Sequence, residues 1–336
     1  MSRPAIQPGI LRLTDMDLLL LGLSSLARRR ILPAAVEAGF ERIEAASRSA
    51  AANGWTSPSV ARIYPDYCVA LAESHAQIVY ISTVNSLHAE LAEAALRRGF
   101  HVIVDKPAFL SLADARRLLD LAAQAGRCLA EATVWQCHPR VRMAMEVFRD
   151  AGSRPTQIAA AFSMPPLAES DFRYRAECGG GALWDLGPYA MTPGRVFFGV
   201  PPSETMARAT STNGSVDTAF SLLSLYPEGR SLTGFFGYTT GYINRLQIAG
   251  PGLVVNMDRV FSPPAALATE LSVSDAAGTR LLPVPATDNF ALFLGKVVQA
   301  ISTGDHAVLA AELLEDAEAI DALRRSALSL SPPVTA

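Results

Sequence analysis

The residues best suited to carry chemistry are one lysine in the first half of the chain and an acid and a phenol in the second half. Lys106 follows the apolar run HVIV almost directly, within Asp105-Lys106-Pro107. Asp185 and Tyr189 lie four residues apart in GGGALWDLGPYAM. In a helix, this spacing places both side chains on one face. An ammonium, a carboxylate and a phenol in one cleft suit the stabilisation and protonation of an oxygen that gains negative charge.

Each of these residues also has a purely structural interpretation. A lysine just past a strand is equally typical of a solvated loop cation. A capped helix with one buried carboxylate and one core tyrosine accounts equally for Asp185 and Tyr189. The three glycines 179–181 favour a site, because they let two backbones approach closely ahead of the acid and the phenol. The elements around Lys106 decide between the two interpretations.

The segment that positions Lys106 is predicted to be strand, helix and strand over residues 79–107. VYIST is a β-rich apolar run, Asn85 and Ser86 are suited to cap the following helix, and Gly99 is suited to end it. Two parallel strands joined by one helix are buried on both faces, and ligands bind outside the carboxyl ends of such strands. Lys106 is therefore expected at a ligand site.

An earlier segment has the pattern of a dinucleotide-binding turn. The strand-like run MDLLLL is followed by GLSSLA, in which Ser24 and Ala27 take the places of the second and third glycines. Such a turn directs backbone N–H groups at a helix N-terminus toward a pyrophosphate. We expect the cofactor to be bound by this turn and by residues at the ends of the next strands: Gly22, Ser24, Ser25, Leu26, Ala27, Thr83, Asn85, His88, Asp105 and Lys106.

The end of the second strand bears on which dinucleotide is bound. About 20 residues after the turn, where an acid would bind the ribose, the chain has Ser47 and Arg48. A hydroxyl followed by a guanidinium suits a 2′-phosphate, so NADP(H) is preferred and NAD(H) remains possible. The structural alternative is a surface arginine on the next helix. Glu44 lies inside the strand and is a poorer candidate for binding the ribose.

Length and patterning predict two domains. The chain has 336 residues, more than most single domains have. Half of its residues are hydrophobic, enough for a sizeable core. Residues 1–16 are expected to be a loose leader, and strands alternating with helices to residue 136 predict an α/β domain with a parallel Rossmann sheet. Residues 137–336 predict an α+β domain with an open, mostly antiparallel sheet. The uncovered face of that sheet favours a homodimer or homotetramer.

Charge and cysteine spacing exclude several classes of protein. A net charge of −3 without a long run of one sign gives no indication of a nucleic-acid or membrane surface. The apolar run 18–21 is far too short to span a membrane and lacks the flanks of a secretory signal. The four cysteines show no CxxC spacing, so neither a metal site nor a disulfide framework is expected. A reducing, cytoplasmic setting follows as the expectation.

Taken together, the GLSSLA turn, NSLHAELAEAALRRGFHVIVDKP and GGGALWDLGPYAM resemble the Gfo/Idh/MocA family of nicotinamide-dependent oxidoreductases over nearly the whole chain. The runs FSMPPLAESDFRYRAECGGGALWDLGPYA and MDRVFSPPA are most similar to NADPH-dependent C3-ketoreductases of TDP-linked keto-deoxysugars. The resemblance implies that Lys106 contacts the reacting carbonyl, Tyr189 supplies the proton, and Asp185 positions the substrate or the lysine. Three residues depart from the usual family pattern: Asp105 replaces a glutamate, Ser24 replaces a glycine, and Tyr189 stands where many members have histidine.

Other residues are expected to contact the substrate, namely Trp135, His138 and Arg173. Arg173 is suited to neutralise a sugar-nucleotide diphosphate, although a solvated loop arginine is equally consistent. For His138, a role at the start of a helix is at least as consistent as substrate binding.

Two further functions stay open at this stage. One is an oxidative dehydrogenase of a free sugar, an inositol or a dihydrodiol on the same fold. The other is a non-catalytic sensor that binds the dinucleotide. Lys106 and Tyr189 speak against the sensor, because a pure binding protein needs neither of them.

Overall fold

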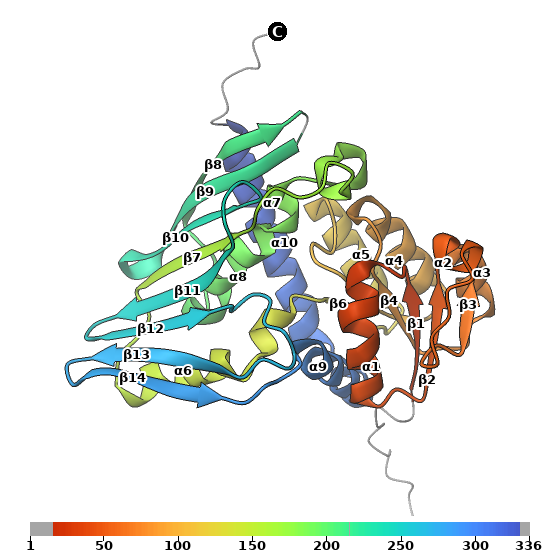
Figure 1. The fold of residues 1–336 in the computed structure, drawn as a ribbon, viewed down its shortest axis with the longest axis horizontal. Helices are drawn as coiled ribbons and strands as arrows, with labels where there is room; N and C mark the ends of the chain where they lie inside the picture. Colours follow the sequence, from red (N-terminus) through yellow and green to blue (C-terminus); the bar gives the residue numbers. More distant parts are fainter. Residues whose placement is uncertain (1–15, 215, 330–336) are drawn as a thin grey trace, which may run out of the picture.

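The computed structural model describes residues 16–214 and 216–329, so all of the predicted leader except Met16 lies outside the described residues. Figure 1 shows two sheets side by side, with the last helix of the chain running from the far end of the second sheet to the first half of the molecule. Each half is organised around one sheet.

The first sheet has six strands in the order β3-β2-β1-β4-β5-β6, and all neighbouring strands are parallel. Its strands are β1 Asp17–Leu21, β2 Arg42–Ala46, β3 Arg62–Tyr64, β4 Ile78–Ile81, β5 His101–Val104 and β6 Leu129–Glu131. Its helices are α1 Leu32–Ala38, α2 Arg48–Ala52, α3 Tyr67–Glu73, α4 His88–Arg97 and α5 Leu112–Gln124, with a wide helical turn at Ala27–Ile31 before α1. Since the strand order reverses between β1 and β4, a crevice opens at the carboxyl ends of these two strands. The predicted Rossmann sheet is confirmed.

The second sheet has eight strands in the order β14-β13-β12-β11-β7-β10-β9-β8, and only β7 and β10 are parallel neighbours among the described strands. Its strands are β7 Gln157–Ser163, β8 Glu204–Asn213, β9 Val216–Tyr226, β10 Arg230–Gly237, β11 Ile243–Gly250, β12 Leu253–Asp258, β13 Thr269–Asp275 and β14 Gly278–Val284. The open, mostly antiparallel sheet predicted for the second half is confirmed.

The helices of the second half cover one side of this sheet, except α9, which packs against the first half. They are α6 Pro139–Asp150, α7 Ala182–Asp185, α8 Gly187–Phe198, α9 Asn289–Thr303 and α10 Ala307–Ser329. Short 3-10 turns occur at Asn85–Leu87, Val134–Cys137, Phe172–Tyr174, Ala176–Cys178 and Pro227–Gly229. Phe290, Phe293 and Leu294 of α9 are buried in the same core as Leu20 of β1. A helix near the end of the chain thus completes the first core, and a domain boundary after residue 136 stays a prediction.

Two local predictions need correction. Asn85 and Ser86 do not cap the helix α4, because residues 85–87 form a 3-10 turn that leads into it without a side-chain cap. The helix predicted across Asp185 and Tyr189 is divided at Leu186 into α7 and α8. Pro188 explains the division, since proline has no N–H to donate and clashes with the preceding turn of a continuous helix.

Candidate active site

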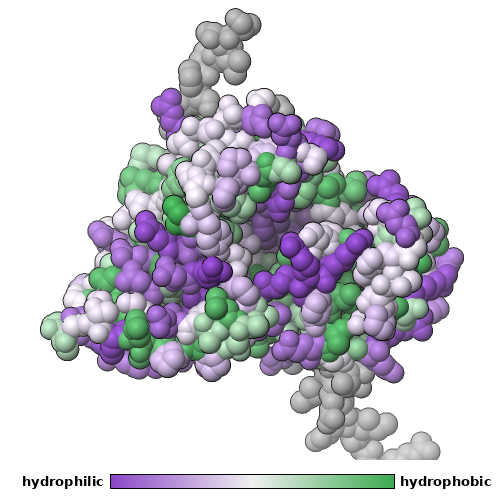
Figure 2. Space-filling model, viewed as in Figure 1, coloured by the Kyte–Doolittle hydropathy of each residue, from purple (hydrophilic) through white to green (hydrophobic). Residues whose placement is uncertain are grey.

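A cavity of about 420 Å³ lies between the two halves, at the carboxyl ends of β1, β4 and β5. Figure 2 shows the molecule hollowed here, with hydrophilic side chains on both sides of the hollow. The residues predicted for the site that line this cavity are Ser24, Ser25, Leu26, Thr83, Asn85, Asp105, Lys106, Arg173, Asp185 and Tyr189. The fold therefore gathers the lysine, the acid and the phenol in one place, although they are far apart in sequence.

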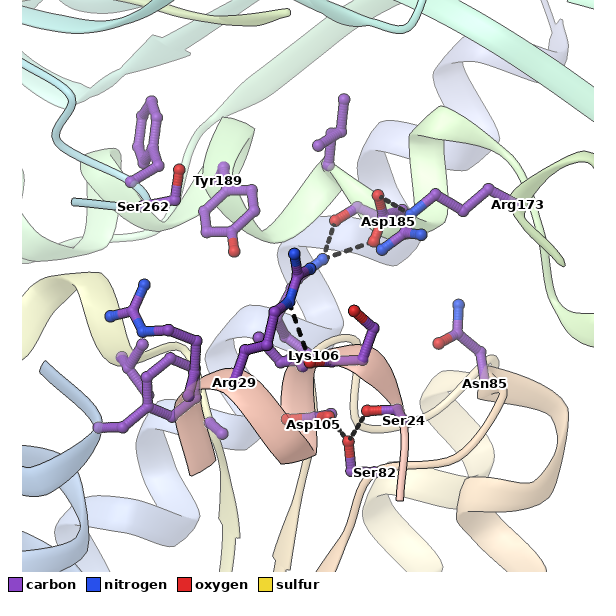
Figure 3. A pocket seen from close by; sticks show the side chains of 18 of the residues that line it. Ser24, Arg29, Ser82, Asn85, Asp105, Lys106, Arg173, Asp185, Tyr189 and Ser262 are labelled. Atoms are coloured by element: carbon purple, nitrogen blue, oxygen red, sulfur yellow. Dashed lines mark hydrogen bonds and ion pairs between the residues drawn. The ribbon is translucent and has the colours of Figure 1, made fainter. Parts of the chain in front are cut away.

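Lys106 is held in the cavity by Asp185. Its Nζ donates hydrogen bonds to the backbone oxygen of Asp185 and, at 2.7 Å, to Oδ1 of the same residue (Figure 3). The side chain of Lys106 is only 14% exposed and that of Asp185 only 9%. Lys106 stands at the end of β5 and Asp185 at the end of α7, so this ion pair joins the two halves of the molecule.

The other oxygen of the Asp185 carboxylate has two donors of its own. Arg173 Nε lies 2.8 Å from Oδ2, and the hydroxyl of Tyr238 donates to the same atom at 2.6 Å. Burial raises the pKa of Asp185, but Arg173 and Lys106 outweigh burial and hold this pKa well below its usual range. Burial lowers the pKa of Lys106, yet Asp185 and Tyr189 more than offset it, so the net pKa is raised. Lysine and aspartate are therefore both charged at neutral pH.

Tyr189 lies beside the lysine with its hydroxyl uncommitted. Lys106 Nζ is 4.9 Å from the centroid of the Tyr189 ring, and the ring packs edge-on against Phe162. Among the described residues, the hydroxyl of Tyr189 has no hydrogen-bond partner. Burial raises the pKa of this phenol, and Lys106 opposes that shift only in part. The phenol thus carries its proton at neutral pH, next to a cation that would stabilise the phenolate.

Two of the three glycines before α7 allow close packing: Gly179 against the first half of the molecule and Gly181 against β9. Gly179 has φ +72°, and a Cβ there would lie 2.6 Å from a methyl carbon of Leu110 and 2.9 Å from Cβ of Asn85. The side-chain amide of Asn85 donates to the backbone oxygen of Gly179 at 2.9 Å. A Cβ at Gly181 would lie 2.7 Å from an oxygen of Asp217. Larger side chains would therefore push Asp185 away from Lys106.

The turn after β1 fits the pyrophosphate of a dinucleotide. Gly22 has φ +98°, and a Cβ there would lie 2.3 Å from the backbone oxygen of Ser82, so only glycine fits. Ser24 Oγ accepts a hydrogen bond from the backbone N–H of Ala27 at 2.9 Å, which caps the helical turn. Ser25 and Leu26 are exposed and line the cavity. This arrangement places a helix N-terminus at the site, as binding of a dinucleotide requires.

Ser24 and Asp105, the two departures from the family pattern in this region, are linked. Ser24 Oγ lies 2.8 Å from Ser82 Oγ, and Ser82 donates to Asp105 Oδ2 at 2.6 Å (Figure 3). Tyr80 donates to the other oxygen of Asp105 at 2.7 Å. Burial raises the pKa of Asp105, and these hydroxyl donors oppose the rise. Asp105, although shorter than a glutamate, is therefore hydrogen-bonded by hydroxyl groups from β4 and from the residue that follows it.

Ser47 and Arg48 lie at the carboxyl end of β2 but outside the lining of the cavity. Ser47 is buried, and its Oγ accepts a hydrogen bond from the N–H of Ala50 at 3.2 Å. Arg48 is exposed, with its guanidinium 5.9 Å from the centroid of the Tyr67 ring. Both positions agree with the place where a 2′-phosphate would lie, and the contact itself stays a prediction.

Apart from Gly22, Ala27, Ser47 and Arg48, three residues predicted for the site lie outside the lining of the cavity. His88 is fully buried with its ring nitrogens 3.0 Å from the backbone oxygen of Pro107 and 3.3 Å from that of Thr83. Trp135 is fully buried, and His138 is buried at the start of α6, where its Nδ1 accepts from a backbone N–H. These side chains satisfy core and helix-end positions, so their predicted contacts with cofactor or substrate have no support in the geometry. Gly22 and Ala27 lie beneath the turn and shape it.

The structure adds lining residues that sequence reasoning missed. Arg29 and Arg30 reach the cavity from the first half, and Phe261 and Ser262 reach it from the loop after β12. Asn244 fixes this loop, because its Oδ1 accepts from the N–H of Phe261 and its Nδ2 donates to Ser262 Oγ, both at 3.0 Å. The position of the two arginines directly after the glycine turn was the available signal.

Neither a metal cluster nor a membrane span is found within residues 16–214 and 216–329. No three His, Cys, Asp or Glu side chains in these ranges gather where they could hold a metal ion. No helix in the same part of the chain is long and apolar enough to cross a bilayer. The four cysteines are unpaired.

Comparisons with known families agree with this geometry. The model of the oxidoreductase family with an NAD-binding Rossmann fold, GFO_IDH_MocA, matches residues 19–133. The model of the GFO/IDH/MocA C-terminal domain matches residues 150–252.

Individual relatives cover most of the chain. A dTDP-3,4-didehydro-2,6-dideoxy-alpha-D-glucose 3-reductase of Streptomyces violaceoruber is 32% identical, over 91% of this chain and 94% of the relative. A solved structure of a 3-ketoreductase from Actinomadura kijaniata, in complex with NADP and TDP-benzene, is 29% identical with a TM-score of 0.85, over 93% of this chain and 98% of that one. An aldose-aldose oxidoreductase of Caulobacter crescentus, 23% identical with a TM-score of 0.81, shares the fold over 94% of this chain and 98% of its own.

Proposed function

This chain belongs to the Gfo/Idh/MocA family of oxidoreductases, and from that premise we propose that it reduces a keto group, at C3, of a nucleotide-linked keto-deoxysugar with NADPH. One observation carries the proposal. A lysine cation fixed by Asp185 lies 4.9 Å from the ring centroid of a tyrosine with an uncommitted hydroxyl, in the same cavity as the dinucleotide turn.

The donors of Lys106 are distributed as carbonyl reduction requires. An ammonium group has three N–H donors, and two of them go to the backbone oxygen and the Oδ1 of Asp185. One N–H is left for a substrate oxygen. Because the Lys106 side chain is only 14% exposed, its fixed cation interacts more strongly than a solvated one with the negative charge that grows on a carbonyl oxygen.

NADPH supplies the hydride when it is bound. Tyr189 then gives its proton to the same oxygen that Lys106 polarises. The phenolate that remains lies next to the Lys106 ammonium, which stabilises it until the proton is replaced from solvent. Asp185 acts on the reaction through Lys106, by holding both the position and the charge of the lysine.

Further features of the proposal concern the cofactor and the setting. NADP(H) is favoured over NAD(H) by Ser47 and Arg48 at the end of β2. The solved 3-ketoreductase of Actinomadura kijaniata, which holds NADP and TDP-benzene, supports a sugar nucleotide as the substrate. A cytoplasmic setting agrees with four unpaired cysteines and with the supply of NADPH. We also propose that the open face of the second sheet joins subunits into a dimer or tetramer.

A free-sugar dehydrogenase is the second candidate. It is supported by a relative named D-xylose 1-dehydrogenase (NADP(+)) 2 from Haloferax volcanii, which is 25% identical over 85% of this chain. Four cations and three carboxylates line the cavity, and this excess of positive charge favours an anionic substrate over a neutral sugar.

The test is single-turnover oxidation of NADPH with a TDP-3-keto-deoxysugar. We expect Lys106→Ala to lose most of the turnover while NADPH affinity stays nearly unchanged, because its contact strengthens only as the carbonyl oxygen gains charge. Tyr189→Phe keeps the ring packing and removes the proton donor, for a rate loss of roughly 10²–10⁴-fold. Tyr242→Phe is the matched control, since this exposed tyrosine also contacts Phe162 but lies outside the lining.

Near wild-type rates in both Lys106→Ala and Tyr189→Phe would show that these residues are structural. Turnover of free D-xylose with NADP⁺, in the absence of turnover of the sugar nucleotide, would favour the second candidate.

A further inference from the structure

Two arginines in the cavity have no anionic partner among the described residues. Arg29 and Arg30 line the same cavity as Lys106, on the helical segment that follows the dinucleotide turn. The remaining charged groups of the lining are already engaged. Lys106 and Arg173 share Asp185, Arg173 also contacts Asp171, and the carboxylate of Asp105 accepts from two hydroxyls. The unpaired positive charge of the lining therefore lies on Arg29 and Arg30.

Both arginines are held in place. Arg29 Nε donates to the backbone oxygen of Ser25 at 3.3 Å, which fixes the stem and leaves the two terminal nitrogens free. Figure 3 shows the Arg29 side chain rising from its helix into the space between the halves. The guanidinium of Arg30 lies 5.2 Å from the centroid of the Phe290 ring of α9, and its buried Nε has no hydrogen-bond partner. Guanidinium groups positioned in this way suit the oxygens of a phosphate.

The position of the pair favours the substrate over the cofactor. The pyrophosphate of the dinucleotide has backbone N–H groups available at residues 24–26, at the start of the helical segment. Arg29 and Arg30 lie one turn further along the helical segment. The Arg30 guanidinium lies over the Phe290 ring, and Ser262 and Pro263 from the loop after β12 line the same cavity. A substrate that enters between the halves would meet the pair.

We propose that Arg29 and Arg30 bind the diphosphate of the sugar-nucleotide substrate, an inference that rests on the proposed function. The diphosphate of such a substrate is attached to C1, two ring carbons from the C3 carbonyl. The sugar ring would thus extend from the arginines to Lys106 and Tyr189. From the sequence, Arg173 was the residue expected to bind the diphosphate. In the structure, Arg173 is paired with two carboxylates, which leave it little free charge.

The test measures the affinity of thymidine diphosphate (TDP) and of thymidine for the protein saturated with NADP⁺, by calorimetry. In Arg29→Gln and Arg30→Gln, we expect TDP to bind about 10- to 100-fold more weakly, the usual loss for one charge-assisted contact. Thymidine and NADPH should bind with unchanged affinity. Arg28→Gln is the matched control, because the guanidinium of Arg28 lies 4.9 Å from the Trp55 ring and outside the lining.

Unchanged TDP affinity in both variants would overturn the inference and leave the proposed function standing. A loss of NADPH affinity as large as the loss of TDP affinity would also overturn it, since the arginines would then belong to the cofactor. If the unmodified protein binds no TDP, the proposed nucleotide-linked substrate fails, and the inference fails with it. Unchanged NADPH affinity also reports that each variant is folded.

Discussion

Replacing Asp185 by asparagine tests the ion pair on which the proposed chemistry depends. The carboxylate of Asp185 accepts from Lys106, Arg173 and Tyr238, and its side chain is only 9% exposed. Asparagine keeps the shape and one acceptor oxygen but removes the negative charge. Two cations then face each other across a neutral amide, and Lys106 is the more deeply buried of the two.

The cost in stability follows from burial. Removing one partner of a buried ion pair typically costs about 3–5 kcal/mol, because the charge left behind is uncompensated. Arg173 is 31% exposed and can turn partly to water, so we expect the lower end of that range. Urea unfolding at pH 7 measures this loss. The matched control is Asp171→Asn, which contacts Arg173 at 3.3 Å without touching Lys106 and should cost far less.

The pH dependence gives the sharper result. Burial lowers the pKa of Lys106, and Asp185 is the first of the groups that offset it, so the Lys106 pKa should fall in the Asp185→Asn variant. The alkaline limb of the single-turnover rate should then move to lower pH.

Stability should also depend on pH. The pKa of Asp185 is depressed in the folded protein, so the stability that its carboxylate contributes is present above the unfolded pKa, near pH 4, and is lost as the pH falls below that value. The stabilities of the two proteins should converge in acid.

An alkaline limb at the same pH in both proteins would refute this account of Lys106. Equal differences in stability at pH 7 and below pH 4 would show that the charge of Asp185 is not what stabilises the fold.

Two other predictions concern the cofactor and the assembly. Arg48→Ala should weaken the binding of NADPH by about 1.5–3 kcal/mol and leave the binding of NADH nearly unchanged, because only NADPH carries the 2′-phosphate. Fluorescence titration with both cofactors measures this, and equal losses would remove Arg48 from cofactor selection. Sedimentation at micromolar concentration should give a dimer or tetramer through the open face of the second sheet, where residues such as Thr233 and Gln247 are exposed. Monomer alone would contradict that assembly.

Much of the fold was predictable because each half has one dominant periodicity. The first half alternates buried strands with amphipathic helices, and its strand order follows from the parallel crossovers. The sequence of β14 gives only a weak strand signal. It begins at a glycine with φ +117°, contains Pro283 and has mostly exposed side chains, as is typical of a strand at the edge of a sheet. The packing of α9 against the first core depends on contacts between distant segments, which local patterns do not report.

The site was predictable where a residue stands at a fixed place in a motif. Lys106 follows a buried strand, and Asp185 and Tyr189 follow a run of glycines, so their convergence could be expected. Histidines gave no comparable signal, because a histidine at the start of a helix serves equally well as a cap, as His138 does. In the sequence, the signal for Arg29 is its place shortly after the glycine turn, which an ordinary surface arginine can also take. Its place in the cavity depends on the opposite wall, which the second half supplies.

The two unusual residues of the cofactor region account for each other. A serine in place of glycine would crowd a pyrophosphate if its hydroxyl pointed outward, and an aspartate in place of glutamate would reach less far. In this structure the Ser24 hydroxyl is bonded to Ser82, and Ser82 donates to Asp105. Since the proton of Ser82 goes to the carboxylate, Ser24 must donate to Ser82, and its lone pairs remain for the N–H of Ala27. One chain of hydroxyls thus fixes the helical turn to Asp105, the residue before Lys106, just past the end of β5.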